Sequence, residues 1–316
     1  MSKLRPLIAV TLCLVLCSST SQAWFGFGHM AVAYVAYQKL TPEKKARVAQ
    51  LLKKNPYYKT KWKAQIPAGT PLDQQDLMYF MIAATWPDEI KSDSTYINDG
   101  SANGDRPPSG PNASQNIGYS DKNRHKYWHF VDTPFTQDGT APLPAIPHPN
   151  AESEIAVLRQ TLASTRPDTL KSYDLVWLLH LVGDVHQPLH SSTRVDAGDP
   201  GGDNGGNNVK LAAPGSELHA FWDGLPGDSS KVADAIVYGK TLAAADPLLA
   251  KKPAAADWIK ESFDIAQTTV YSSPIGTTDG PFTITPEYKT KAEKIAAERV
   301  ELAGERLANL INDELK

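Results

Sequence analysis

Cysteine is almost absent from this chain of 316 residues, and its two cysteines, Cys13 and Cys17, both lie near the amino terminus. They belong to a segment with two basic residues, then an apolar run over residues 7–17, then small and polar residues. This order is typical of a secretory signal peptide, and the apolar run is too short to span a membrane. We therefore predict a signal peptide over residues 1–23. The exported mature chain, from Trp24 on, would hold no disulfide and would depend on core packing or bound metal.

An excess of positive charge is missing as well. Removing Lys3 and Arg5 from the 32 basic residues leaves 30 against 35 acidic residues, a formal net charge of -5 for the mature chain. Proteins that bind nucleic acid usually present positive charge to the phosphates, so this balance argues against such a ligand. Bound cations would remove the objection, because they invert the local field.

Strand patterns are few and short, and amphipathic helical patterns dominate. Residues 92–123 and 133–150 are rich in Pro, Gly, Asn and Ser, which predicts two long surface loops. No change of composition marks a linker, so we expect an all-α fold in one compact domain over residues 24–316. The helices are predicted at residues 29–40, 42–54, 151–162, 174–187, 229–244, 253–270 and 286–315, with Thr-Pro start signals at 41–42, 70–71 and 285–286.

The segment WLLHLVGDVHQPLH, residues 177–190, concentrates polar chemistry in an apolar helical pattern. His180 and Asp184 are four residues apart and share one helix face, where burial is costly unless a cation pairs them. Pro188 ends the helix, and His190 follows at its exit. This arrangement suits two neighbouring metal ions. Taken alone, the segment is equally compatible with a core histidine and an ion-paired aspartate.

Candidate partners precede this segment in the chain. The predicted mature terminus begins at Trp24, whose α-amino group would titrate at about 7.7 to 8.0 and could bind zinc near neutral pH, with His29 close by. In isolation, a buried tryptophan and a surface histidine are the more probable interpretation. Asp88 follows a Trp-Pro pair, and Lys91 comes one turn later. A helix cap explains Asp88 equally well.

Two further segments carry histidine and carboxylate together. Residues 128–132 read WHFVD and are predicted to be extended, which would put His129 on one face and Phe130 and Asp132 on the other. After a glycine-rich loop, His219 and Asp223 are again four residues apart. They form a second helical pair that needs a positive counter-charge.

Together these segments resemble the zinc-dependent single-strand nucleases of the S1/P1 nuclease family, in the phospholipase C/P1 nuclease superfamily. The resemblance covers essentially the whole mature chain and rests on the Trp24 terminus with its nearby histidine, WPD, WHFVD, HLVGDVHQPLH, GGDNGGN and LHAFWD. It implies a mainly helical fold that binds three Zn²⁺ ions. The implied ligands are Asp88, His129, His180 and Asp184 for one ion; Trp24, His29 and again Asp184 for a second; and His190, His219 and Asp223 for the third.

The resemblance also implies the reaction. Members cleave the P–O3′ bond of single-stranded DNA and RNA to give 5′-mononucleotides, and many remove the phosphate of 3′-nucleotides. Asp88, Lys91 and Asp184 would carry the catalysis, although Lys91 replaces the usual arginine and lacks its bidentate fork. Phe130 would stack on a base and Asp132 would hydrogen-bond the base edge.

Two alternatives stay open at this point. A zinc phospholipase C acting on choline phospholipids would use the same ions, but such enzymes carry glutamate where Asp223 stands and have a shorter spacer between His190 and His219. A zinc-binding protein without activity is the other. We expect a monomer with no membrane span, periplasmic or secreted.

Three histidines, His125, His148 and His186, match no ligand position and are expected at the surface or beside the ligands. The sequence departs from the family in one respect: plant and fungal members usually carry disulfides, and the mature chain has no cysteine. The lack of cysteine in the mature chain favours a bacterial exported protein. The sequon at residues 112–114 does not decide whether the chain is glycosylated.

If the α-amino group of Trp24 is a ligand, one residue added ahead of it should impair the site, because an amide nitrogen has no lone pair to offer. We expect a Met or Gly extension to lower occupancy of the zinc shared with His29 and Asp184, and to leave the zinc on His190, His219 and Asp223 bound. Metal analysis and activity on single-stranded DNA would compare the extended and authentic termini. Equal zinc content and equal rates would contradict the assignment.

Overall fold

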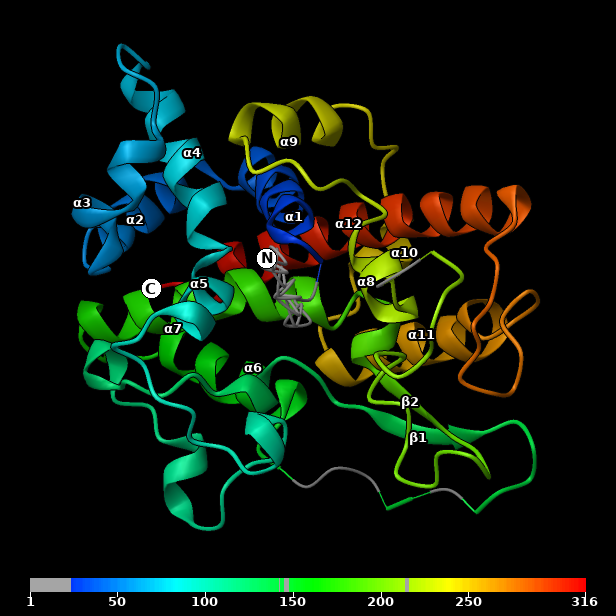
Figure 1. Ribbon diagram of the computed structural model, residues 1–316. Helices are drawn as coiled ribbons and strands as arrows, with labels where there is room; N and C mark the ends of the chain where they lie inside the picture. Colours follow the sequence, from blue (N-terminus) through cyan, green and yellow to red (C-terminus); the bar gives the residue numbers. More distant parts are fainter. Residues whose placement is uncertain (1–23, 142, 145–147, 214–215) are drawn as a thin grey trace, which may run out of the picture.

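The fold is mainly helical, as predicted. The computed structural model describes residues 24–141, 143–144, 148–213 and 216–316, so the predicted signal peptide lies outside the described residues. Two short strands accompany the helices: β1 (Thr133–Thr136) and β2 (Ser192–Val195). The helices, shown in Figure 1, are α1 (Gly26–Lys39), α2 (Pro42–Leu52), α3 (Tyr57–Thr60), α4 (Leu72–Ala83), α5 (Trp86–Ser92), α6 (Ala151–Leu162), α7 (Asp168–Asp184), α8 (Leu218–Asp223), α9 (Val232–Gly239), α10 (Pro247–Ala250), α11 (Ala255–Ile265) and α12 (Pro286–Glu314).

Helix α7 is the central element. Every residue from Lys171 to Asp184 is buried, because α1, α2, α5, α6 and α12 pack around this helix. Figure 1 shows α7 crossing the middle of the molecule, with α12 running behind α1. All seven tryptophans are buried, six of them in the core that contains α7 and Trp222 in a second apolar cluster. The apolar run that the sequence shows on both sides of His180 is thereby explained.

Two of the Thr-Pro start signals act as predicted. The side chains of Thr41 and Thr285 accept hydrogen bonds from the first turns of α2 and α12, and proline follows each threonine. At the third signal, Pro71 takes the cap position of α4. Several bounds differ: α7 begins at Asp168 rather than 174, α9 covers only part of 229–244, and α11 passes into a π-helical turn over Ala266–Val270.

The prediction of an extended segment over residues 128–132 is wrong. Lys126–Trp128 forms a turn of 3-10 helix, His129 keeps helical dihedral angles, and Asp132 adopts a left-handed φ of 48°. The strand β1 follows this segment and pairs with β2 in parallel, so residues 133–150 are not wholly a loop either. Alternation therefore does not determine which way His129, Phe130 and Asp132 point. The turn does.

Of the two positions expected for the remaining histidines, His125 takes the buried one, next to the turn that carries His129, and His148 takes the exposed one. The His125 ring stacks on Trp128, with centroids 3.8 Å apart. Its Nε2 lies 2.9 Å from Asp121 Oδ2 and its Nδ1 lies 2.8 Å from Asp99 Oδ2. His125 therefore holds the long segment 92–123 against the turn that carries His129.

A pH dependence of stability follows from this clamp. Burial disfavours the charged imidazole of His125, but hydrogen bonds to Asp121 and Asp99 outweigh burial and raise its pKa. Other titratable groups near the ring are Tyr127 and Glu154. Because the folded pKa exceeds the unfolded value of about 6.5, the stabilisation is fully present below that value and is lost as pH rises through the folded pKa.

We therefore expect His125→Gln to lower the free energy of unfolding by about 1.5 to 3 kcal/mol at pH 5.5. The loss should be smaller at pH 9. Denaturant unfolding of both proteins at the two pH values, in one zinc-containing buffer, gives the comparison. A loss of equal size at both pH values would show that His125 is not held in its charged form.

Candidate metal centre

The first cluster is built on the face of α7 that carries His180 and Asp184. Asp184 Oδ2 lies 3.3 Å from His180 Nε2, and Asp184 Oδ1 lies 3.3 Å from His29 Nε2 of α1. The rings of His29 and His180 stack with centroids 3.7 Å apart. All three side chains are fully buried. One carboxylate of α7 thus meets histidines from two helices, one with each oxygen.

His129 and Asp88 complete this cluster. His129 Nδ1 lies 3.0 Å from both Asp184 Oδ2 and His180 Nε2. From the first turn of α5, Asp88 Oδ1 lies 3.6 Å from His180 Nε2, and Lys91 Nζ lies 2.7 Å from the same oxygen. Asp88 is within its helix rather than at the cap. The side chains that the sequence predicts as ligands of two of the ions therefore lie together in the first cluster, apart from the Trp24 terminus.

Trp24 lies against the same end of α7. Its side chain is fully buried, and its Nε1 donates to the Gly183 carbonyl at 3.1 Å. A Cβ at Gly183 would lie 2.8 Å from His29 Nδ1, so only glycine allows this close approach. Gly183 is a part of the site that was not predicted from the sequence. A glycine inside a helical pattern was the available signal.

The second cluster joins the turn after α7 to α8. His190 Nε2 and His219 Nε2 are 3.1 Å apart, and Asp223 Oδ2 lies 3.4 Å from His219 Nε2. Gln187, which the sequence analysis also missed, donates from Nε2 to Asp223 Oδ1 at 2.7 Å. This amide fixes one oxygen of Asp223 and leaves the other facing the histidines.

Backbone carbonyls orient three of the rings. The Nδ1 atoms of His180, His190 and His219 donate to the carbonyls of Ala84, His129 and Gly205 at 2.6–2.7 Å. Each Nε2 is thereby left without its proton and directed into a cluster. This pattern is the usual second interaction of a histidine that binds a metal.

Burial sets the protonation of both clusters. Desolvation lowers the pKa of His129, His180 and His190, and lowers that of His219 to about 4, so these imidazoles are neutral. Desolvation raises the pKa of Asp184 and Asp223. Neutral imidazole is the form that binds a metal ion.

The clusters fit metal ions on the chemistry of their donors. Asp184 Oδ1 and Asp223 Oδ2 are buried and accept no hydrogen bond from the described residues. Buried carboxylates of this kind are costly without a cation. Donor atoms lie within 4.8 Å of one another in each of three groups: His29, Asp88 and His180; His129, His180 and Asp184; and His190, His219 and Asp223. Mixed imidazole and carboxylate ligation is typical of catalytic zinc.

Phe130 and Asp132 lie next to the second cluster. Between them, the Val131 amide donates to the His190 carbonyl at 2.8 Å. Both side chains are half-buried. Desolvation, with a smaller effect of Asp203, raises the pKa of Asp132.

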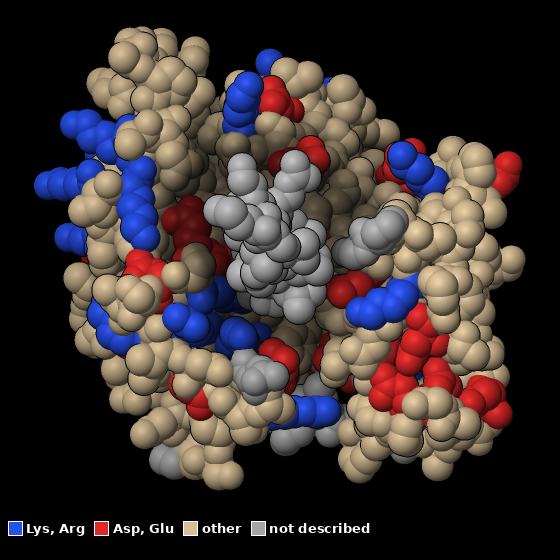
Figure 2. Space-filling view, viewed as in Figure 1, with Lys and Arg blue, Asp and Glu red and all other residues tan. Residues whose placement is uncertain are grey.

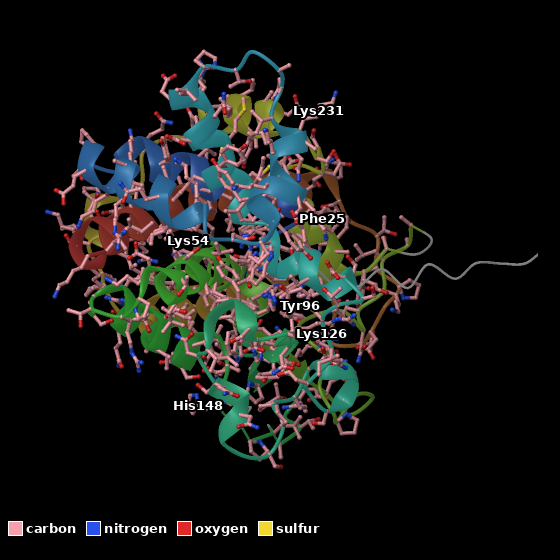
Figure 3. The ribbon with its side chains drawn as sticks, turned by 90° about the vertical axis from the view of Figure 1, so that its left-hand side faces the viewer. Phe25, Lys54, Tyr96, Lys126, His148 and Lys231 are labelled. Carbon is pink, nitrogen blue, oxygen red and sulfur yellow. The ribbon has the colours of Figure 1, made fainter. Side chains whose placement is uncertain are left out.

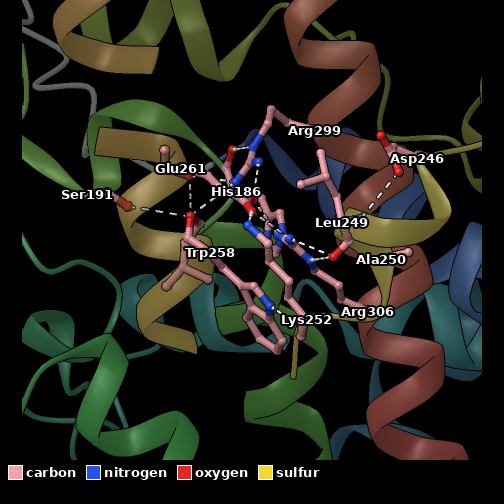
Figure 4. A network of polar contacts seen from close by, with 12 residues as sticks. His186, Ser191, Asp246, Leu249, Ala250, Lys252, Trp258, Glu261, Arg299 and Arg306 are labelled. Atoms are coloured by element: carbon pink, nitrogen blue, oxygen red, sulfur yellow. Dashed lines mark hydrogen bonds and ion pairs between the residues drawn. The ribbon is translucent and has the colours of Figure 1, made fainter. Parts of the chain in front are cut away.

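A buried network supports the turn between Asp184 and His190, as Figure 4 shows. Arg299 of α12 donates from Nε to the His186 carbonyl at 3.1 Å, and Ser262 of α11 donates to the Val185 carbonyl at 2.6 Å. Arg306 Nη1 lies 2.9 Å from His186 Nε2, and Glu261 pairs with both arginines. His186 is thus buried beside the ligands rather than at the surface. Nothing in the sequence separates these arginines from other basic residues of α12.

Comparison with known proteins agrees with this geometry. A family described as S1/P1 Nuclease matches residues 24–316. No curated protein matches the chain at a significant level.

Replacing Asp184 with Asn should remove metal from the first cluster, because its two oxygens face histidines of different helices. The loss of metal affinity should exceed the roughly 10- to 100-fold that loss of an outer hydrogen-bond partner costs. Metal analysis after dialysis against a weak chelator measures the change. Asp174→Asn, a buried position on the same helix that is hydrogen-bonded to Asn116, is the matched control and should keep its metal. Full metal content in Asp184→Asn would contradict the assignment.

Proposed function

Because the chain belongs to the S1/P1 nuclease family, we propose that it is an exported, zinc-dependent endonuclease and 3′-nucleotidase. It hydrolyses the P–O3′ bond of single-stranded DNA, RNA and 3′-nucleotides and gives 5′-mononucleotides from the polymers. The observation that carries this proposal is the pair of buried histidine and carboxylate clusters joined through α7 and its following turn.

Three Zn²⁺ ions would occupy the clusters. Two would share Asp184, one of them with Asp88, His129 and His180, and the other with His29 and the amine and carbonyl of Trp24. The third would be held by His190, His219 and Asp223. When bound, zinc lowers the pKa of a coordinated water to about 7 and stabilises negative charge on phosphate and leaving oxygens.

The protein side chains around the clusters bind and orient the substrate. Lys91 is nearly buried beside Asp88, so its ammonium group is held at the first cluster. There it would stabilise negative charge on a bound phosphate. Lysine supplies this charge at one point, whereas arginine would grip two oxygens.

Phe130 and Asp132 would receive a nucleobase beside His190. A phenyl ring stacks on any base, but only if the base is unpaired, which gives a physical reason for the preference for single strands. The Asp132 carboxyl would hydrogen-bond the edge of the same base. The left-handed backbone at Asp132 sets its direction relative to Phe130.

The charge distribution agrees with a nucleic-acid substrate despite the acidic composition. Figure 2 shows Lys and Arg side chains on the side of this face that carries α2 to α5, whereas Asp and Glu side chains gather at the lower right. No helix among the described residues is long and apolar enough to cross a membrane. We propose export to the periplasm or the medium, after removal of residues 1–23.

The test of this function is to incubate the mature protein with single-stranded DNA, RNA and phosphatidylcholine, with and without chelator. We expect 5′-mononucleotides from both nucleic acids, no product from the lipid, loss of activity with chelator and recovery on addition of zinc. Release of choline phosphate without nucleotides would instead show a phospholipase. Activity that survives metal removal would contradict a zinc mechanism.

A further inference from the structure

A cavity of about 460 Å³ opens beside the first cluster, and the proposed mechanism does not use it. Phe25, Phe27 and Met30 of the amino-terminal segment form its apolar wall. Its polar walls include Asp88 and Glu89 of α5 and residues 228–230 ahead of α9; the other lining residues are Gly26, Gln65, Thr85 and Ser92. In the view of Figure 3, Phe25 is drawn between Lys231 and Tyr96. Lys231 directly follows the lining residues 228–230.

The walls do not suit a phosphate. No Lys or Arg is among the described residues that line the cavity. The lining residues Glu89 and Asp228 carry carboxyl groups. Thr85 Oγ1 donates to Glu89 Oε1 at 2.8 Å and holds this carboxyl group in place. Carboxylates and serine hydroxyls bind the amino, imino and hydroxyl groups of a neutral ligand. The volume is within the range of sites for small organic molecules.

The reaction itself creates a need for a second nucleoside position. When the P–O3′ bond breaks and water adds its oxygen to phosphorus, the upstream nucleoside leaves with a 3′-hydroxyl group. The downstream nucleoside keeps the phosphate on its 5′ oxygen. A 3′-mononucleotide has only the upstream nucleoside, so a site for the downstream nucleoside would act on polymers and dinucleotides alone.

We propose that this cavity, which we call the Phe25 cavity, binds the nucleoside downstream of the scissile phosphate. Asp88 is in its wall, whereas Phe130, Asp132 and His190 are not. The cavity therefore meets the metal centre at the Asp88 end, away from the base position proposed next to His190. The Phe25 ring offers a stacking surface, and Glu89 and Asp228 offer acceptors to the base or sugar. This inference rests on the proposed function.

The test compares kcat/KM for a dinucleotide with kcat/KM for a 3′-mononucleotide, using the mature zinc-loaded enzyme. Ser230 is exposed at the cavity, and its hydroxyl makes no hydrogen bond to the described residues, so Ser230→Trp should fill the cavity without unfolding the chain. Asp228→Ala removes an acceptor. The matched control is Asp257→Asn, an exposed carboxylate of α11.

We expect Ser230→Trp to lower the ratio of dinucleotide to mononucleotide kcat/KM by about tenfold, the effect of one lost base contact. Asp228→Ala should lower it less, and Asp257→Asn should leave it unchanged. Calorimetry with 5′-AMP, which mimics the downstream product, should show weaker binding to Ser230→Trp.

An unchanged ratio in both cavity variants would overturn the inference, even if both rates fell together, and would leave the proposed function standing. A wild-type protein that cleaves neither substrate would instead overturn the proposed function, and this inference with it.

Discussion

The structure depends on the burial of Asp184 and His180 in the centre of a helical protein. A carboxylate and an imidazole so far from solvent are stable only if other groups replace their hydration. Helix α1 supplies His29, the turn after residue 125 supplies His129, and α5 supplies Asp88. The fold therefore brings together segments that are far apart in the chain, and each of them supplies a polar partner to Asp184 or His180 of α7.

The two clusters are also connected to each other. His190 belongs to the second cluster, but its Nδ1 donates to the carbonyl of His129, which belongs to the first. The turn that separates Asp184 from His190 is held from behind by Arg299 and Ser262. A shift of that turn would move ligands of both clusters at once, so α11 and α12 help to fix the distance between them without contributing a ligand.

Sequence reasoning reached the helical class, the caps at Thr41 and Thr285 and the mutual proximity of the predicted ligands, because each rests on a local pattern or a family motif. It failed where long-range contacts decide. Residues 128–132 look extended by alternation, yet the clamp of His125 between Asp99 and Asp121 accompanies a turn. Gly183 and Arg299 matter through neighbours more than 100 residues away, and no local pattern reports such neighbours.

The close packing of α1 against α12 has a consequence for how the chain acquires its shape. A Cβ at Gly304 would lie 2.5 Å from Val35 Cβ, so the two helices touch almost backbone to backbone. Helix α1 is synthesised early, but it can pack against α12 only after α12 has been synthesised. Translation proceeds at roughly 5–20 residues per second, and until it ends α1 and its His29 lack this support. Assembly of the ligands is in this sense a post-translational event, which would suit the export that we propose for this chain.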